Sequence, residues 1–179
     1  MRLQTLDDAH LVTRAKAGSV DAFEELVHRH RDRAFRVALR MVGDRGEAED
    51  ITQDALVAAW RSLDGFRADS AFTTWLHRIV LNRCLNALRA RRETEPLPDD
   101  RASARPSTER TVEARIKLED VRQAILQLTP EQRGPLVLRE LEDCSYDELA
   151  ESLDVSVSAV KSRLHRARLE LLNAVRGWQ

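Results

Sequence analysis

A polar stretch near the middle of the chain constrains its fold more than any other feature of the sequence. The segment Glu93–Ser107 reads ETEPLPDDRASARPS and contains Pro96, Pro98 and Pro106, with almost no apolar side chain. This composition cannot bury enough apolar surface to join a packed core, and its prolines favour extended backbone. It predicts a flexible linker of about 15 residues between two modules of roughly 80 residues each.

The composition of the 179-residue chain favours helices on both sides of this linker. Aromatic residues make up only 4%, and Ala, Leu, Arg and Glu, which are strong helix formers, are abundant. Runs of β-branched residues, which mark sheets, are scarce. We therefore expect an all-α protein of two small helical domains, over residues 8–92 and 111–176, joined by a flexible linker over residues 93–110.

Apolar spacing and capping residues predict four helices in the first domain. The first covers residues 8–17, and the second carries apolar residues from Phe23 to Met41 at helical spacing and stops at Gly43. Asp44 and Glu47 have the spacing of a capping box and open a third helix through Leu63. Its wheel shows a broad apolar arc opposite the acids, with Ile51, Ala55, Leu56, Ala59, Trp60 and Leu63.

The fourth helix is expected from an N-cap at Ser70 to about Arg91, and it has two distinct faces. One is an apolar stripe. The other face, within an arc of roughly 80°, gathers Trp75, Arg78, Asn82, Asn86 and Arg89. Amides can read base edges, arginines can hold phosphates and an aromatic ring can stack on an unpaired base. The alternative is an ordinary solvated face with Trp75 turned into the core.

Capping signals in the second domain have the spacing of a helix-turn-helix. A helix from about Thr111 precedes a second that begins at Thr129, in which Pro135 predicts a kink or a tighter first turn. Ser145 and Glu148 form another capping box before a short helix that ends at Leu153. After a turn, Ser156 caps a longer basic helix that runs to about Val175.

The rotation of this last helix follows from its apolar stripe, Val157, Val160, Leu164, Ala167 and Leu171. Polar and basic side chains point away from that stripe, as in a recognition helix that enters the major groove. The alternative is a basic amphipathic helix in an ordinary bundle. The candidate base-reading and phosphate-binding residues are Ser158, Lys161, Ser162, Arg163, His165 and Arg166.

Charge is strongly segregated, although the net charge is only −1. Residues 77–92 contain five arginines and no acid, and residues 160–168 contain one lysine and three arginines and no acid. Acids concentrate at residues 47–54, 93–100 and 140–151. A near-zero total therefore conceals two cationic surfaces and at least one anionic surface.

Motifs for catalysis, cofactors and metals are absent from the sequence. It contains no Gly-rich phosphate loop, GxSxG elbow, HExxH or paired-cysteine site. His28 and His30 lie about 200° apart on a helix, so we expect solvated histidines rather than a metal site. Cys84 and Cys144 are isolated, as expected for buried or partly buried thiols in a reducing compartment. We expect no enzyme, no cofactor and no membrane insertion, and a soluble, cytoplasmic protein.

Four segments in this order resemble the sigma-70 family of bacterial RNA polymerase sigma factors. GDRGEAEDITQD at Gly43–Asp54 and FRADSAFTTWLHRIVLNRCLN at Phe66–Asn86 are similar to region two, and LTPEQR at Leu128–Arg133 and VKSRLHRAR at Val160–Arg168 to region four. The short linker in place of region three resembles the extracytoplasmic-function (ECF) subfamily. The resemblance covers nearly the whole chain.

The resemblance implies a transcription initiation factor that binds core RNA polymerase and directs it to promoters. It assigns Asp50, Gln53 and Asp54 to docking on the β′ clamp helices. It assigns the −10 element to Phe66 together with the polar face of the fourth helix, and the −35 element to the last helix. It also implies contact with the β subunit and names an anti-sigma factor as a further candidate partner.

Two other classes of protein remain open from the residues alone. A stand-alone helix-turn-helix regulator would bind palindromic half-sites without polymerase. An adaptor bundle would show no salt-dependent affinity for DNA.

Overall fold

The structure, a computed structural model, describes residues 6–67, 69–94 and 119–176, and these residues form helices and connecting turns without strands. A helix over residues 119–127 precedes α6. The other elements are α1 (Asp8–Lys16), α2 (Val20–Val42), α3 (Arg45–Ser62), the 3₁₀ helix η2 (Leu63–Gly65), α4 (Phe72–Thr94), α6 (Pro130–Leu141), α7 (Tyr146–Leu153) and α8 (Val157–Arg176). The predicted all-α class is confirmed.

Side-chain caps start several of these helices where the sequence predicted them. The Ser145 hydroxyl accepts from the Glu148 amide at 3.2 Å, and the Glu148 carboxylate accepts from the Ser145 amide at 2.7 Å. Asp44 accepts from the Glu47 amide at 2.8 Å, but the Glu47 carboxylate forms an ion pair with Arg91 of α4. This pair ties the start of α3 to the end of α4.

The fourth helix begins later than predicted. Its first residue is Phe72, and the Trp75 amide donates to the Ala71 carbonyl at 3.2 Å, so Ser70 does not occupy the N-cap position. The helix continues to Thr94, beyond the predicted end at Arg91. The linker after Thr94 and the start of the helix predicted from Thr111 lie outside the described residues.

Pro135 is accommodated inside α6, whose first turn is tight. The amides of Gln132 and Arg133 both donate to the Thr129 carbonyl, at 3.0 and 2.8 Å. The first of these is a 3₁₀-type bond, which narrows the turn. The tighter first turn predicted for this helix is therefore present.

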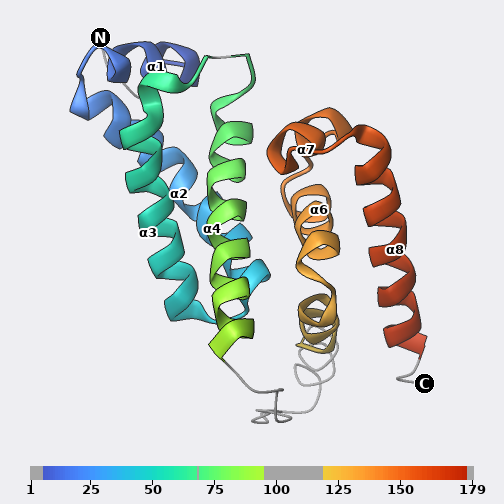
Figure 1. Ribbon diagram of the computed structural model, residues 1–179. Coiled ribbons are helices and arrows are strands. Elements are labelled where there is room, and N and C mark those ends of the chain that lie inside the picture. Colours follow the sequence, from blue (N-terminus) through green and yellow to red (C-terminus); the bar gives the residue numbers. More distant parts are fainter. Residues whose placement is uncertain (1–5, 68, 95–118, 177–179) are drawn as a thin grey trace, which may run out of the picture.

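The helices form two groups, each around its own apolar side chains. In the first group α2, α3 and α4 run side by side and α1 lies across one end, and in the second group α6, α7 and α8 pack together (Figure 1). Leu26, Met41 and Leu76 are fully buried in the first group, and Leu138 and Leu164 in the second.

The two groups also pack against each other. Helix α2 lies beside α6, and α4 lies beside α6 and α7, whereas α8 is on the outer side of the second group (Figure 1). The Arg122 guanidinium donates to the Gly43 carbonyl at 2.5 Å, and the Ser152 hydroxyl donates to the Thr74 carbonyl at 3.2 Å. Gly43 ends α2 with a φ of 81°, a conformation that favours glycine, and a Cβ there would lie 2.8 Å from the end of the Leu126 side chain, which would have to shift.

His30 is buried, so the expectation of a solvated histidine at this position was wrong. Its side chain is 8% exposed, and its Nε2 lies 2.6 Å from the Asp8 carboxylate. The Phe72 ring lies 5.2 Å from the imidazole, centroid to centroid. The contact between His30 and Asp8 holds α1 against α2. Asp8 is far from His30 in the sequence, so helical periodicity could not predict this contact.

Candidate nucleic-acid interface and docking faces

The polar stripe of α4 is open to solvent. Arg78, Asn82, Asn86 and Arg89 are all exposed. Arg89 lies 3.5 Å from the Asn86 amide oxygen, and Arg78 lies 3.7 Å from the Asp154 carboxylate. Four hydrogen-bonding side chains on one exposed face can contact bases or phosphates without any change in the core.

The aromatic residues assigned to the same site are differently placed. Phe66 is only 5% exposed, so its ring belongs to the core in this arrangement. Trp75 is partly buried, with its ring 5.0 Å from Phe66 and 5.7 Å from Phe72, centroid to centroid. Trp75 thus packs on the core through one side and reaches the surface with the other. The exposed amides and guanidiniums make up most of the accessible face.

The acidic face of α3 is exposed as well. Asp50, Gln53 and Asp54 all face solvent, and the Asp54 carboxylate lies 3.7 Å from Arg83 of α4. Because the Asp54 side chain is 72% exposed, this ion pair is well screened and adds little to folding stability. The carboxylates are therefore available to a cationic partner.

Two large apolar side chains beside these acids were missed by the sequence reasoning. Val57 is 47% exposed and Trp60 is 40% exposed, although Trp60 belongs to the apolar arc of the helix. The Trp60 ring lies 4.8 Å from that of Phe23, centroid to centroid. Val57 and Trp60 follow Gln53 by four and seven residues, so they share its helix face. Exposed apolar side chains next to charges are typical of protein-binding surfaces.

The last helix is rotated as its apolar stripe predicted. Val160, Leu164 and Ala167 are buried at 0%, 1% and 0% exposure, and Val157 and Leu171 are partly buried. Arg163 is partly buried, and the other candidate residues are exposed, namely Ser158, Lys161, Ser162, His165 and Arg166. The Ala159 amide donates to the Ser156 hydroxyl at 3.2 Å, which confirms the predicted cap.

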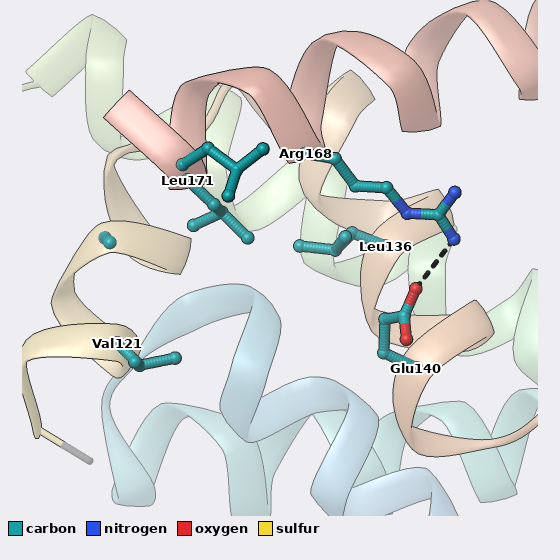
Figure 2. A pocket seen from close by; sticks show the side chains of 7 residues that line it. Val121, Leu136, Glu140, Arg168 and Leu171 are labelled. Atoms are coloured by element: carbon teal, nitrogen blue, oxygen red, sulfur yellow. Dashed lines mark hydrogen bonds and ion pairs between the residues drawn. The ribbon is translucent and has the colours of Figure 1, made fainter. Parts of the chain in front are cut away.

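An apolar groove runs across the second group of helices. Figure 2 shows Val121, Leu136 and Leu171 around a space of about 430 Å³, which Ala124 and Leu172 also line. An ion pair of 2.9 Å between Arg168 and Glu140 lies at its edge (Figure 2). Leu172 is 55% exposed, so the groove can accept an apolar surface from another molecule.

Buried titratable groups lie where the two groups of helices meet. Burial lowers the pKa of His77 to about 4, and its Nδ1 lies 3.7 Å from the Cys144 sulfur. Burial also raises the pKa of the Cys84 thiol to about 12 and that of Cys144 to about 11, so both remain protonated at neutral pH. Both cysteines are free and buried.

The described residues contain no cluster of three or more His, Cys, Asp or Glu side chains that could hold a metal ion. None of the helices among them is long and apolar enough to cross a membrane.

Comparison with known families assigns the two groups of helices. Residues 26–94 match the model of sigma-70 region 2, and residues 118–171 match that of sigma-70 region 4. The chain belongs to the sigma-70 family. This sigma factor is 38% identical over 173 residues to the RNA polymerase sigma-H factor of Pseudomonas aeruginosa, with 90% of each chain covered. It is 35% identical to the ECF RNA polymerase sigma-E factor of Escherichia coli, with 96% of each covered.

Solved structures share the fold. CnrH, solved in complex with the cytosolic domain of CnrY, superposes with a TM-score of 0.73 at 33% identity, covering 95% of this chain and 97% of CnrH. The sigma factor RpoE of Bartonella quintana, solved with the anti-sigma factor NepR, has the same fold, with a TM-score of 0.72 at 24% identity over 88% of this chain and 98% of that one. The chain is therefore an ECF sigma factor, a factor for transcription initiation.

Proposed function

We propose that this sigma factor binds core RNA polymerase and directs it to promoters by reading a −10 and a −35 element. The observation that carries the proposal is the pair of exposed faces, one on α4 and one on α8, with side chains suited to bases and phosphates. The match to a family of transcription initiation factors supports action by binding. The protein's place of action is the cytoplasm, where bacterial polymerase works.

The α4 face is suited to a −10 element whose strands are separated. Asn82 and Asn86 can each make two hydrogen bonds to an adenine edge, and Arg78 and Arg89 can hold the backbone. Trp75 can stack on an unpaired base with its exposed side, because stacking needs one ring face. Phe66 would have to leave the core to contact the DNA. We therefore propose that it supports this face from the core and does not contact a base itself.

The α8 face is suited to a −35 duplex. Helices α7 and α8 form the helix-turn-helix, and Arg166 can pair with guanine O6 and N7 in the major groove. Its guanidinium lies 3.3 Å from the Ser162 hydroxyl, one turn earlier on the same face. The side chains proposed to read bases therefore lie near the middle of α8.

Two further surfaces are suited to the polymerase. The exposed acids of α3, with Val57 and Trp60 beside them, offer a charged and apolar patch for the β′ clamp helices. The apolar groove of region four, with Leu172 at its edge, is our candidate for the contact with the β subunit.

The packing of the two groups indicates that the chain must open to act. Two separate elements on one duplex move apart by ~3.4 Å for each base pair between them. A compact chain of this length has a radius of gyration of only about 16 Å. We therefore propose that domains 8–92 and 111–176 separate on the linker 93–110, and that the polymerase surface sets their spacing. The two weak contacts with DNA, one from each domain, then act together as one bivalent interaction.

A protein that holds the closed arrangement would inhibit this function. CnrH was solved with CnrY, and the sigma factor of Bartonella quintana with an anti-sigma factor. We propose a partner of the same kind for this chain.

Transcription from a randomised promoter library tests the function directly. Purified core polymerase with the wild-type chain should select −10 and −35 sequences and produce run-off transcripts, and core polymerase alone should not. Sequence-specific binding of palindromes by the chain without polymerase would instead favour a stand-alone helix-turn-helix regulator. Absence of any salt-dependent DNA affinity would favour an adaptor bundle.

A further inference from the structure

The last residue of α1 reaches the turn that leads from α3 into α4. Lys16 is exposed, and its ammonium donates to two main-chain carbonyls of that turn, to Asp64 at 3.2 Å and to Phe66. Both carbonyls lie at the end of the short helix η2, where carbonyls have no partner within the helix. Helix α1 crosses region two beside this turn (Figure 1). The ammonium therefore ties the turn to α1 by charge-assisted hydrogen bonds.

The backbone of Phe66 is held on both sides. Its amide donates to the Leu63 carbonyl at 3.0 Å, and its carbonyl accepts from Lys16. Because both peptide groups of the residue are fixed, the direction in which its side chain leaves the backbone is fixed as well. The buried Phe66 ring lies 5.0 Å from that of Trp75, centroid to centroid, at an angle of 37°. A change at Lys16 can thus reach Trp75 through a single residue.

A second ring beside Trp75 is also tied to α1. The Phe72 ring lies 5.7 Å from that of Trp75 and 5.2 Å from the His30 imidazole. His30 in turn lies 2.6 Å from the carboxylate of Asp8, the first residue of α1. The two ends of α1 therefore act on the two phenyl rings that support the partly buried indole. The placement of these rings decides where the indole meets the surface.

We propose that Lys16 is a positioning residue for the opening of the −10 element. It fixes Phe66, which in turn holds the Trp75 indole ready to stack on an unpaired base. The inference rests on the proposed role of Trp75 in the α4 face, and it assigns no DNA contact to Lys16 itself. Because Lys16 is exposed, its loss should change strand opening and not thermal stability. Binding to core polymerase, which is proposed for α3, should also stay unchanged.

The test measures strand opening by the holoenzyme at a promoter selected from the randomised library, with 2-aminopurine in the −10 element as the fluorescent probe. Lys16→Met removes the ammonium and keeps a long side chain. This variant should open the promoter about two- to tenfold more slowly, as expected for the loss of a hydrogen bond from a charged group. Initial binding of the duplex, measured at a low temperature at which the strands stay paired, should keep the wild-type affinity because α8 is untouched.

Three further variants separate positioning from a general effect of charge. Lys16→Arg keeps a cationic donor on a long side chain and should restore most of the opening rate. Arg14→Met removes an exposed cation from the same helix and should open the promoter at the wild-type rate. When Lys16→Met is added to Trp75→Ala, it should cause little further slowing, because it acts through that ring.

The outcomes distinguish this inference from the proposed function. A wild-type opening rate in Lys16→Met together with slow opening in Trp75→Ala overturns the positioning role and leaves the α4 face intact. Equal slowing by Lys16→Met and Arg14→Met would show an effect of charge alone and would also overturn it. If Trp75→Ala opens the promoter at the wild-type rate, the proposed role of Trp75 fails and the role of Lys16 fails with it.

Discussion

Arg33 of α2 and Glu142, in the loop between α6 and α7, form an ion pair that joins region two to region four. The Arg33 Nε lies 2.8 Å from one Glu142 carboxylate oxygen, and Arg36 lies 3.3 Å from the other. The Glu142 side chain is fully buried, whereas the arginines remain 46% and 53% exposed. The carboxylate is thus removed from water and depends on both guanidiniums for its compensation.

Substitution of Glu142 should loosen the closed arrangement. Glu142→Gln removes the charge at constant size. The two half-exposed arginines can be rehydrated, so we expect the contact between the regions to lose about 1–3 kcal/mol of stabilising free energy. Small-angle scattering should show a larger radius of gyration. Glu49→Gln, which removes an exposed surface acid on α3, is the matched control. An unchanged radius for Glu142→Gln would mean that other contacts hold the regions together.

Acid should weaken the protein through His77. Burial, and then Arg33 and His30, lower its pKa to about 4 from an ordinary 6.5, while Glu148 acts in the opposite direction. The unfolded chain therefore binds more protons between these values, and the free energy of unfolding should fall as pH drops from 6.5 to 4, by about 3 kcal/mol at most.

Denaturant unfolding at several pH values measures this effect against His77→Leu, which has no imidazole to protonate. The difference in the free energy of unfolding between the wild type and His77→Leu should change with pH between 4 and 6.5 and be constant above pH 6.5. Parallel curves throughout would show that His77 takes up its proton equally in both states.

Asp54→Arg should weaken binding to core polymerase. The change reverses a charge on the proposed β′-docking face, and we expect at least a tenfold loss of affinity, about 1.4 kcal/mol. Thermal stability should hardly change, because Asp54 is exposed. Asp32→Arg makes the same charge change on the exposed side of α2 and should bind core polymerase normally. Equal affinities of the two variants would remove the docking assignment.

Asn82→Ala and Asn86→Ala should each relax selection within the −10 element. Both amides are exposed, so the expected loss of about 1–3 kcal/mol per base contact concerns DNA and not folding. Asn173→Ala, at an exposed amide near the end of α8, is the control. Run-off transcription from a set of −10 variants measures the change, and an unaltered ranking of these promoters by both variants would speak against the α4 face.

Arg166→Ala should act on a single position of the −35 element. Loss of a bidentate guanine contact costs about 1–3 kcal/mol and relaxes selection at one base pair. Holoenzyme binding to −35 variants measures it. Lys161→Ala provides the contrast, since loss of a phosphate contact weakens all sequences evenly. Retention of both affinity and base preference by Arg166→Ala would show that α8 does not read the duplex through this residue.

Local patterns were sufficient for much of this molecule. The capping pairs at Ser145 and Ser156 marked the helix-turn-helix, because a cap depends on residues three positions apart. The stripe through Val160 and Leu164 set the rotation of α8 and hence its exposed face, because a helix must turn its apolar side inward. The acidic face of α3 and the polar face of α4 followed from the same periodicity.

Other features depend on neighbours that periodicity does not contain. His30 is buried because Asp8 reaches it, Trp60 stays 40% exposed although its ring packs on Phe23, and the charge of Glu142 is balanced from the other region of the chain. A helical stripe tells which side of a helix is apolar, but not which element packs there or how completely. Burial of a polar group is decided by partners far away in sequence, so the contact between regions two and four emerged only from the tertiary structure.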